Sequence, residues 1–280
     1  MDDDKNVIFG LERNYPDANN IFGTKRTPIL DVLDTCDIVL DTNVLLLPYR
    51  TASEDFEQIR IIYEEILDRL YIPERVAREF ARQRPHALQE LAKNLDMYYS
   101  SSRISKLDIP LLSSELIELR TADLMLVEAR KEFRRILKDV KNRLDSWEHS
   151  DPVMNVYHEL FGKVVLLGPS MNEEEILEQL KSRHAREMPP SYENRAKIDG
   201  GVGNLIIWLS MLEHAKQAKN DMIFVTNNIA GWCHLASRNA FLPRIELINE
   251  YSYVSNGKCL YIISLSELLR LHNVEIDDID

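Results

Sequence analysis

The sequence predicts an α/β fold with a central, mostly parallel sheet and helices on both of its faces. Two short apolar runs, DIVLD at 37–41 and MIFVT at 222–226, have the length and β-branched content of buried strands. Each run ends in a Thr/Asn-rich turn, and helical patterns lie between the two runs and after the second. Alternating strands and helices are typical of parallel sheets, whose functional residues gather at the carboxyl ends of the strands.

The composition suits one large globular body. Of the 280 residues, 45% are hydrophobic and 29% are charged. Apolar runs stay well short of the roughly 18 to 20 residues of a membrane helix, and the amino end is acidic where a signal peptide would be basic. We therefore expect a cytoplasmic protein that contacts no membrane. The three cysteines are too few and too far apart for a disulfide framework or a zinc site.

Charge limits the class of partner. The formal net charge of -12 argues against broad, charge-driven binding of nucleic acid. Two basic runs, 75–84 and 128–143, stand out against this acidic background. They are either solvated helix faces or local phosphate-binding surfaces.

The first half of the chain is predicted to be helical after residue 41. From about Ser53 to Leu70, apolar residues recur at helical spacing, and Pro73 then opens a second helix. Residues 88–148 have an almost wholly helical pattern with an interruption at 101–112. Their apolar residues follow a near-heptad spacing, which predicts a helical hairpin packed on the body. The stripe consists of Leu112, Leu116, Leu119, Leu126, Phe133, Leu137, Val140, Leu144 and Trp147.

The second half returns to the alternating pattern. A short helix is predicted at 173–180, followed by an ordered Pro-Pro loop at 186–197 and a glycine-rich turn that opens an apolar helix at 200–216. RIELI and CLYIIS are predicted strands. SLSELLRL is a predicted helix that begins at Ser264 or Ser266.

Asp41 is the first candidate site residue, because it directly follows a buried strand. The turn at 227–228 follows the other predicted strand, so the two should be neighbours at one edge of the sheet. A carboxylate in that place could hold a divalent metal ion. It could also cap the helix or turn that follows.

Seven blocks of the sequence resemble, in order and approximate spacing, the PIN-like domains of the DUF4935 group, which are relatives of the PIN-domain nucleases. They are VLDTNVLLLPYR, YIPERVAREFARQR, DPVMNVYHELFGK, REMPPSYENR, GGVGNLIIWL, IFVTNNIAGW and IELINEY with LYIISLSELL. The resemblance covers roughly residues 37 to 270. It implies a three-layer α/β/α PIN-like fold over 37–280, after a lead-in of residues 1–36, with a helical arm inserted at about 88–148.

The resemblance also implies four acidic positions that hold one or two Mg²⁺ or Mn²⁺ ions for phosphodiester hydrolysis. Asp41 matches the first acid and Glu79 the second. Asn43 matches the polar residue that steadies the first acid. The third and fourth acidic positions are occupied here by Asn204 and Asn228.

The two amides are the main departure from the family pattern. An Asn oxygen can face a metal ion, but it brings no charge and accepts no proton, so we expect weak binding of Mg²⁺ or Mn²⁺. Asp199 and Glu193 are possible substitutes if their loop folds inward. Thr226 belongs to the Thr-x-Asp pattern of the fourth acid and is a supporting residue. A natural change and a deliberate inactivation both fit the pair of amides.

Arg82 and Arg84 are the candidates for contacts with substrate phosphates, since a guanidinium fork suits that acceptor. Glu79 could alternatively pair with an arginine of its own helix. The first functional hypothesis is a metal-dependent endonuclease that acts on RNA in preference to DNA. The alternative is a catalytically inactive protein that binds nucleic acid or regulates a partner. A third is a partner or self-association surface on the helical arm. By analogy alone, the resemblance suggests toxin or phage-defence nucleases.

Overall fold

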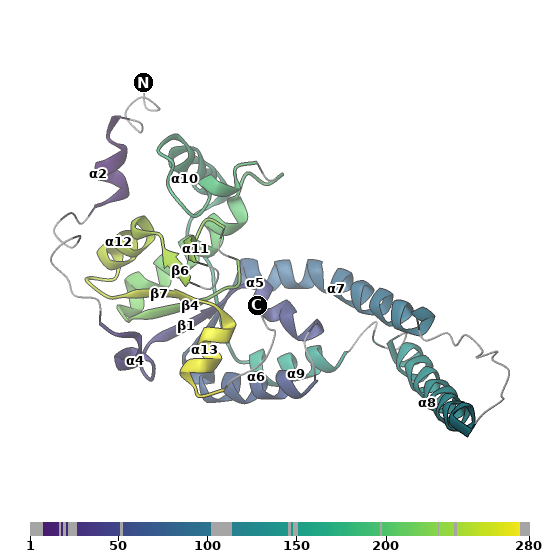
Figure 1. Cartoon of the computed structure of the whole chain (residues 1–280). Coiled ribbons are helices and arrows are strands. Elements are labelled where there is room, and N and C mark those ends of the chain that lie inside the picture. Colours follow the sequence, from purple (N-terminus) through teal and green to yellow (C-terminus); the bar gives the residue numbers. More distant parts are fainter. Residues whose placement is uncertain are drawn as a thin grey trace. The chain divides into compact units, whose positions relative to one another are not determined.

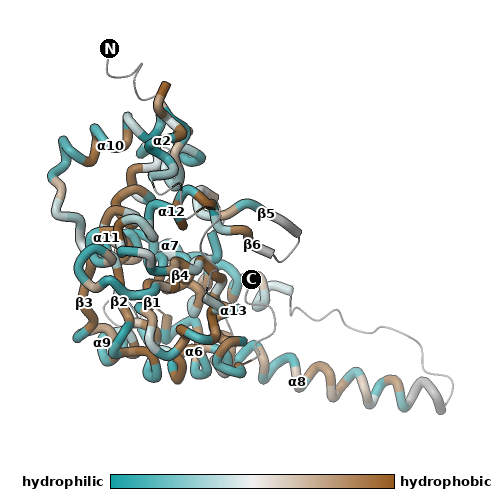
Figure 2. Tube along the Cα trace, turned by 90° about the vertical axis from the view of Figure 1, so that its left-hand side faces the viewer, coloured by the Kyte–Doolittle hydropathy of each residue, from teal (hydrophilic) through white to brown (hydrophobic). Residues whose placement is uncertain are grey.

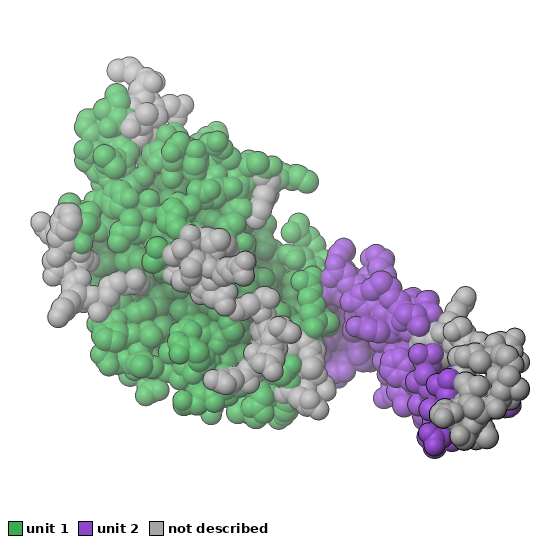
Figure 3. Space-filling model, in the orientation of Figure 1, with its two compact units in different colours: residues 1–83, 160–280 green, residues 84–159 purple. Residues whose placement is uncertain are grey.

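The computed structural model describes residues 8–16, 18, 21, 27–50, 53–101, 114–144, 147, 151–196, 198–228, 230–237 and 240–274. The chain divides into two units (Figure 3): a sheet unit, Met1–Gln83 with Leu160–Asp280, and a helical unit, Arg84–Glu159. The arm expected at about 88–148 lies within the helical unit.

Five parallel strands form the sheet, in the order β3-β2-β1-β4-β7. β1 is central and fully buried, with Ile38 opposite Leu70 on one side and Ile223 on the other. Continuous apolar runs suit strands that are covered on both faces. The strands are β1 Asp37–Leu40, β2 Leu70–Pro73, β3 Val165–Leu167, β4 Met222–Val225 and β7 Leu260–Ile263. The predicted α/β class is confirmed.

Helices cover both faces of this sheet. α6 and α13 lie on one face and α11 and α12 on the other, as Figures 1 and 2 show from two directions. The helices of the sheet unit are α2 Gly10–Asn14, α4 Ile29–Val32, α5 Thr42–Leu46, α6 Ser53–Glu65, α10 Glu173–Ala185, α11 Val202–Ala218, α12 Ile245–Val254 and α13 Leu265–Leu271. This arrangement gives the three layers that the resemblance implied.

The core between the sheet and α11 is aromatic. Trp208 and Trp232 are fully buried, with ring centroids 6.3 Å apart, and Phe224 of β4 lies 4.7 Å from Trp232. The indole of Trp208 donates to Glu250, and Glu250 also pairs with the buried Arg183 of α10. The two tryptophans therefore act as core anchors.

Two long helices make up most of the helical unit. They are α7 Glu74–Ser101, which begins in the sheet unit, and α8 Ser114–Leu144; α9 Pro152–Phe161 follows. Asp96 of α7 pairs with Lys141 of α8, and the Arg134 guanidinium lies over the Tyr99 ring at 4.4 Å. Because higher residue numbers on α7 meet lower ones on α8, the two helices run antiparallel, as a hairpin requires.

The prediction that the nine apolar residues at near-heptad spacing pack on the body is wrong for part of α8. Leu119, Leu126 and Phe133 are 45%, 47% and 47% exposed, whereas Leu137 is buried. Leu112 and the side chain of Leu116 lie outside the described residues. Three of the seven stripe residues with described side chains are therefore exposed.

Several local predictions differ from the structure. The helix expected to reach Leu70 ends at Glu65, because Leu70–Pro73 pairs beside β1 as β2. Its four residues are too few to show a period of their own. RIELI belongs to helix α12, since Leu247 and Tyr251 bury one helical face. Strand β3, helix α9 and the hairpin β5 Cys233–Ser237 with β6 Ala240–Pro243 were not predicted.

The start of α13 agrees with the prediction. Ser264 is the N-cap of α13 and accepts a hydrogen bond from the Glu267 amide at 3.2 Å. The helices of the described ranges include none that is long and apolar enough to span a membrane.

Candidate active site at the carboxyl end of the sheet

Asp41 is the first residue after β1 and the N-cap of α5. One carboxylate oxygen accepts a hydrogen bond from the Thr42 backbone amide at 2.7 Å. The other oxygen accepts one from the Thr226 hydroxyl at 2.6 Å and one from the Asn43 side-chain amide at 2.5 Å. The side chain therefore caps α5, as one of the two interpretations expected, and it also lines a cleft.

Asn43 joins the two strand ends that the sequence predicted to be neighbours. Its amide nitrogen donates to Asp41 and Thr226, and its oxygen accepts the Asn227 backbone amide at 2.8 Å. The Asn227 side chain in turn accepts the Leu265 amide at 3.0 Å. The turn after β4 is thereby fixed against β1 and α13, and Asp41 is held in one orientation.

Burial raises the pKa of the Asp41 carboxyl. Loss of solvation is the largest cause, and the Glu79 charge acts in the same direction. Hydrogen bonds from Thr226, Thr42 and Asn43 oppose the shift. A buried carboxylate of this kind is stabilised by a nearby cation.

This shift predicts a pH-dependent stability. The folded protein binds more protons at Asp41 than the unfolded chain does, so stability should fall as pH rises from the ordinary Asp pKa of about 3.9 through the raised value. Thermal melts across this window, without divalent metal, should show a component that Asp41→Asn removes. Adding Mn²⁺ at neutral pH should restore stability to the unchanged chain only. Identical pH profiles for the two proteins would contradict the argument.

Glu79 lies on α7 one turn after Arg75, and the two form an ion pair with Nε to Oε1 at 2.6 Å. The Arg75 guanidinium also reaches Asp199 Oδ2 at 3.5 Å, and the Thr42 hydroxyl donates to Glu79 Oε2 at 3.2 Å. The pairing with an arginine of the same helix is therefore present. Arg75 is a bridge between two carboxylates, and sequence reasoning did not assign it this place.

Asp199 also holds the start of α11. Its carboxylate accepts the Gly201 amide at 3.1 Å and the Gly203 amide at 3.3 Å. A Cβ at Gly203 would lie 2.9 Å from Glu79 Oε1 and 3.2 Å from Asp199 Oδ2. A larger residue here would push the ends of the Glu79, Arg75 and Asp199 side chains aside, and the glycine-rich turn in the sequence did not reveal this close approach.

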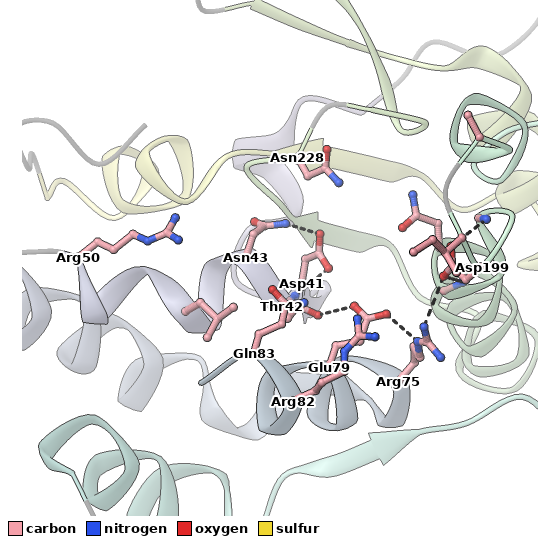
Figure 4. A pocket seen from close by; sticks show the side chains of 16 residues that line it. Asp41, Thr42, Asn43, Arg50, Arg75, Glu79, Arg82, Gln83, Asp199 and Asn228 are labelled. Carbon is pink, nitrogen blue, oxygen red and sulfur yellow. Dashed lines mark hydrogen bonds and ion pairs between the residues drawn. The ribbon is translucent and has the colours of Figure 1, made fainter. Parts of the chain in front are cut away.

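The cleft has a volume of about 820 Å³ and contains most of the predicted site residues (Figure 4). Those that line it are Asp41, Asn43, Glu79, Arg82, Asp199, Asn204 and Asn228. Thr226 is buried and reaches the site through Asp41. Arg50 and Arg75 line the cleft as well, which balances three carboxylates with three guanidinium groups.

The two amides differ in their surroundings. The side-chain nitrogen of Asn204 is buried without a hydrogen-bond partner in the described part of the chain. The side-chain oxygen of Asn228 accepts a hydrogen bond from the Ala230 backbone amide at 3.2 Å, and the Asn228 backbone amide donates to the Thr226 hydroxyl. A carboxylate at position 204 would remove the unpartnered donor.

Oxygen ligands of the kind that hard cations prefer are thus present, with two amides among them. In the described ranges, no group of three or more His, Cys, Asp or Glu side chains is placed to hold a metal ion. Among the carboxylates that line the cleft, Asp41 and Glu79 would hold such an ion, beside the side-chain amides of Asn204 and Asn228. Such sites usually complete their shell with water and substrate phosphates.

Two predicted residues have other contacts. Arg84, in the helical unit, donates to Asp151 Oδ2 at 2.7 Å and to the Trp147 carbonyl at 3.3 Å. Glu193, a possible substitute acid, pairs with Arg244 at 2.6 Å. Neither is among the residues that line the cleft.

Comparison with known families agrees with this geometry. A family described as PIN like domain matches residues 37–247, a range that covers most of the chain and includes Asp41, Glu79, Asn204 and Asn228. Searches among curated proteins and among solved structures gave no significant match. The chain belongs to the PIN like domain family.

Proposed function

We propose that this protein binds nucleic acid in the cleft, RNA in preference to DNA, and hydrolyses it slowly with a divalent metal ion. The observation that carries the proposal is the shared cleft of Asp41, Glu79 and three arginines. A PIN-like fold suggests a nuclease ancestry, and the pairing of carboxylates with guanidinium groups suits a metal ion and a phosphodiester together.

Asp41 and Glu79 would hold Mg²⁺ or Mn²⁺, and the side-chain oxygens of Asn204 and Asn228 would face it. When bound, the ion polarises a phosphoryl oxygen and lowers the pKa of a water molecule. Thr226 and Asn43 keep the Asp41 carboxylate in one orientation by their hydrogen bonds. Arg82 is exposed on α7 at the cleft and would bind a substrate phosphate.

A second candidate function is binding without cleavage. It is supported by the 2.6 Å ion pair between Arg75 and Glu79, which gives the second carboxylate an organic cation as its partner. The amides at 204 and 228 further lower the negative charge available to a metal ion. A protein of this kind would bind or shield RNA, or regulate a partner.

Labelled single-stranded RNA and DNA of one sequence would separate the two candidates. We expect slow RNA cleavage in Mn²⁺ that EDTA and Glu79→Gln abolish. Glu74→Gln is the matched control, because Glu74 lies on the same helix and pairs with Arg78. Tight RNA binding with no cleavage in Mn²⁺ would favour the second candidate, and a chain that neither binds nor cuts would contradict both.

Arg82→Ala should weaken RNA binding without destabilising the fold. Loss of one charged phosphate contact costs about 1.5 kcal/mol, or roughly tenfold in affinity, and should lower the slope of log affinity against log salt by about 1. Fluorescence anisotropy across a salt series measures both quantities. Arg78→Ala is the control, since Arg78 is also exposed on α7 but pairs with Glu74. Equal effects of the two variants would place the RNA elsewhere.

A further inference from the structure

Helix α8 has two faces of opposite character. The residues of one face are buried or half-buried, and half of them are charged: Asp123, Val127, Arg130, Arg134, Leu137, Val140, Lys141 and Leu144. Of these, Arg134 and Lys141 contact α7. The residues on another face are exposed and wholly apolar: Leu119, Ala122, Leu126, Ala129, Phe133 and Ile136. We call this second set the apolar stripe. A helix packed within a chain normally buries its apolar residues, whereas these six stay exposed.

The stripe has the spacing of a coiled-coil seam. Its members alternate at intervals of three and four residues over three heptads, which matches the a and d positions. Leu119, Leu126, Phe133 and Ile136 are each 45% to 47% exposed. A continuous exposed apolar surface of this kind marks a contact with another protein surface.

The occupant that fits best is α8 of a second copy of this chain, in the opposite direction. Residues 114–128 carry four acidic residues and one basic residue, whereas residues 129–143 carry seven basic and two acidic residues. A parallel pair would bring halves of like charge together. An antiparallel pair brings opposite halves together. Favourable interaction with the helix dipole is confined to the first and last turns, so it does not account for charges along the whole helix.

The sizes of the side chains in the apolar stripe also favour an antiparallel pair. With the stripe in antiparallel register, Phe133 lies opposite Ala122 of the second copy and Leu126 lies opposite Ala129. Large residues then face small ones, which fills layers evenly. A parallel pair would set Ala against Ala and Phe against Phe, leaving gaps in some layers and overfilling others. Asp123 would also flank Arg130 of the second copy.

We infer that this protein forms a homodimer through the apolar stripe of α8, with the two helices antiparallel. The inference does not depend on the proposed nuclease function, because the stripe contains none of the cleft residues.

Light scattering after gel filtration of the full chain tests the dimer. At micromolar concentration we expect twice the chain mass of 32.6 kDa. The Leu126→Glu/Phe133→Glu variant should raise the dimer dissociation constant by about 100-fold or more, because it buries charges in the seam. Leu124→Glu is the matched control: Leu124 is 60% exposed on the same helix but lies outside the stripe. Circular dichroism should show equal helix content in all three proteins.

Cysteine pairs test the direction. Phe133→Cys mixed with Ala122→Cys should form a disulfide between the two variants on mild oxidation, and each variant alone should not. In antiparallel register the two copies of residue 133 are about 16 Å apart along the axis. Unchanged protein gives the background from Cys36, Cys233 and Cys259. A monomeric chain, or a dimer that the double Glu variant leaves intact, would overturn the inference. Self-linking of Phe133→Cys alone would overturn the antiparallel direction.

Discussion

Asn204→Asp/Asn228→Asp should cleave RNA in Mn²⁺ at least about 100-fold faster than the unchanged chain. Two unit charges about 4 Å apart interact by about 4 kcal/mol at an effective dielectric constant of about 20, and each 1.4 kcal/mol is worth about tenfold in affinity. Two added carboxylates in the cleft of Asp41 and Glu79 would therefore tighten metal binding strongly. A carboxylate at 204 would also replace the unpartnered amide nitrogen. Single-turnover cleavage at several Mn²⁺ concentrations measures the change.

Asn94→Asp/Asn142→Asp is a suitable control for this experiment. It adds the same charge at exposed positions of the helical unit, outside the lining of the cleft. We expect it to behave as the unchanged chain does. Rapid, EDTA-sensitive cleavage by the unchanged chain would show that Asp41, Glu79 and Asp199 suffice, and that the amides do not weaken the site. Failure of the double variant to cut any RNA or DNA would favour a binding function.

Arg84→Ala should destabilise the protein by about 3 to 5 kcal/mol, which is the usual effect of removing one partner of a buried ion pair. Asp151 is 0% exposed and pairs with Arg84 at 2.6 Å. It also accepts the Met154 amide at 2.8 Å at the start of α9. Loss of the guanidinium would leave a buried carboxylate at the point where a helix begins. Chemical denaturation monitored by circular dichroism measures the effect.

Arg78→Ala provides the comparison on the same helix. Arg78 and Glu74 have side chains that are 70% and 42% exposed, so the loss of this pair should cost less than about 1 kcal/mol. If Arg84→Ala destabilised the protein as little as Arg78→Ala and weakened RNA binding instead, the main function of Arg84 would be the phosphate contact expected from the sequence. We expect the two arginines at 82 and 84 to separate into one binding residue and one stabilising residue.

Local pattern was enough to predict the central strands and the position of Asp41. β1 and β4 are short apolar runs bounded by polar residues and rich in β-branched residues, which favours a strand over a helix. Strands β2 and β3 escaped prediction because runs of three or four residues show no usable period. Their structure depends on pairing with strands that are distant in sequence.

The sequence likewise predicted which residues form the candidate site, but it predicted only some of the contacts between them. Asp41, Glu79, Asn204 and Asn228 were expected in one place, and they line one cleft. The bridge that Arg75 makes between Glu79 and Asp199 was not expected, because Asp199 lies far away in sequence. The close approach of Gly203 to the Glu79 carboxylate was likewise not expected.

The sequence by itself determined the fold class, the strand-end position of Asp41 and the presence of amides at positions 204 and 228, since these depend on local order and residue type. Tertiary structure alone decided which arginine meets the cleft and which face of α8 stays exposed. Neighbouring positions on a helix differ in direction by about 100°, so Arg82 and Arg84 point to different surroundings. Which of those surroundings holds a carboxylate depends on packing between segments that the sequence keeps far apart.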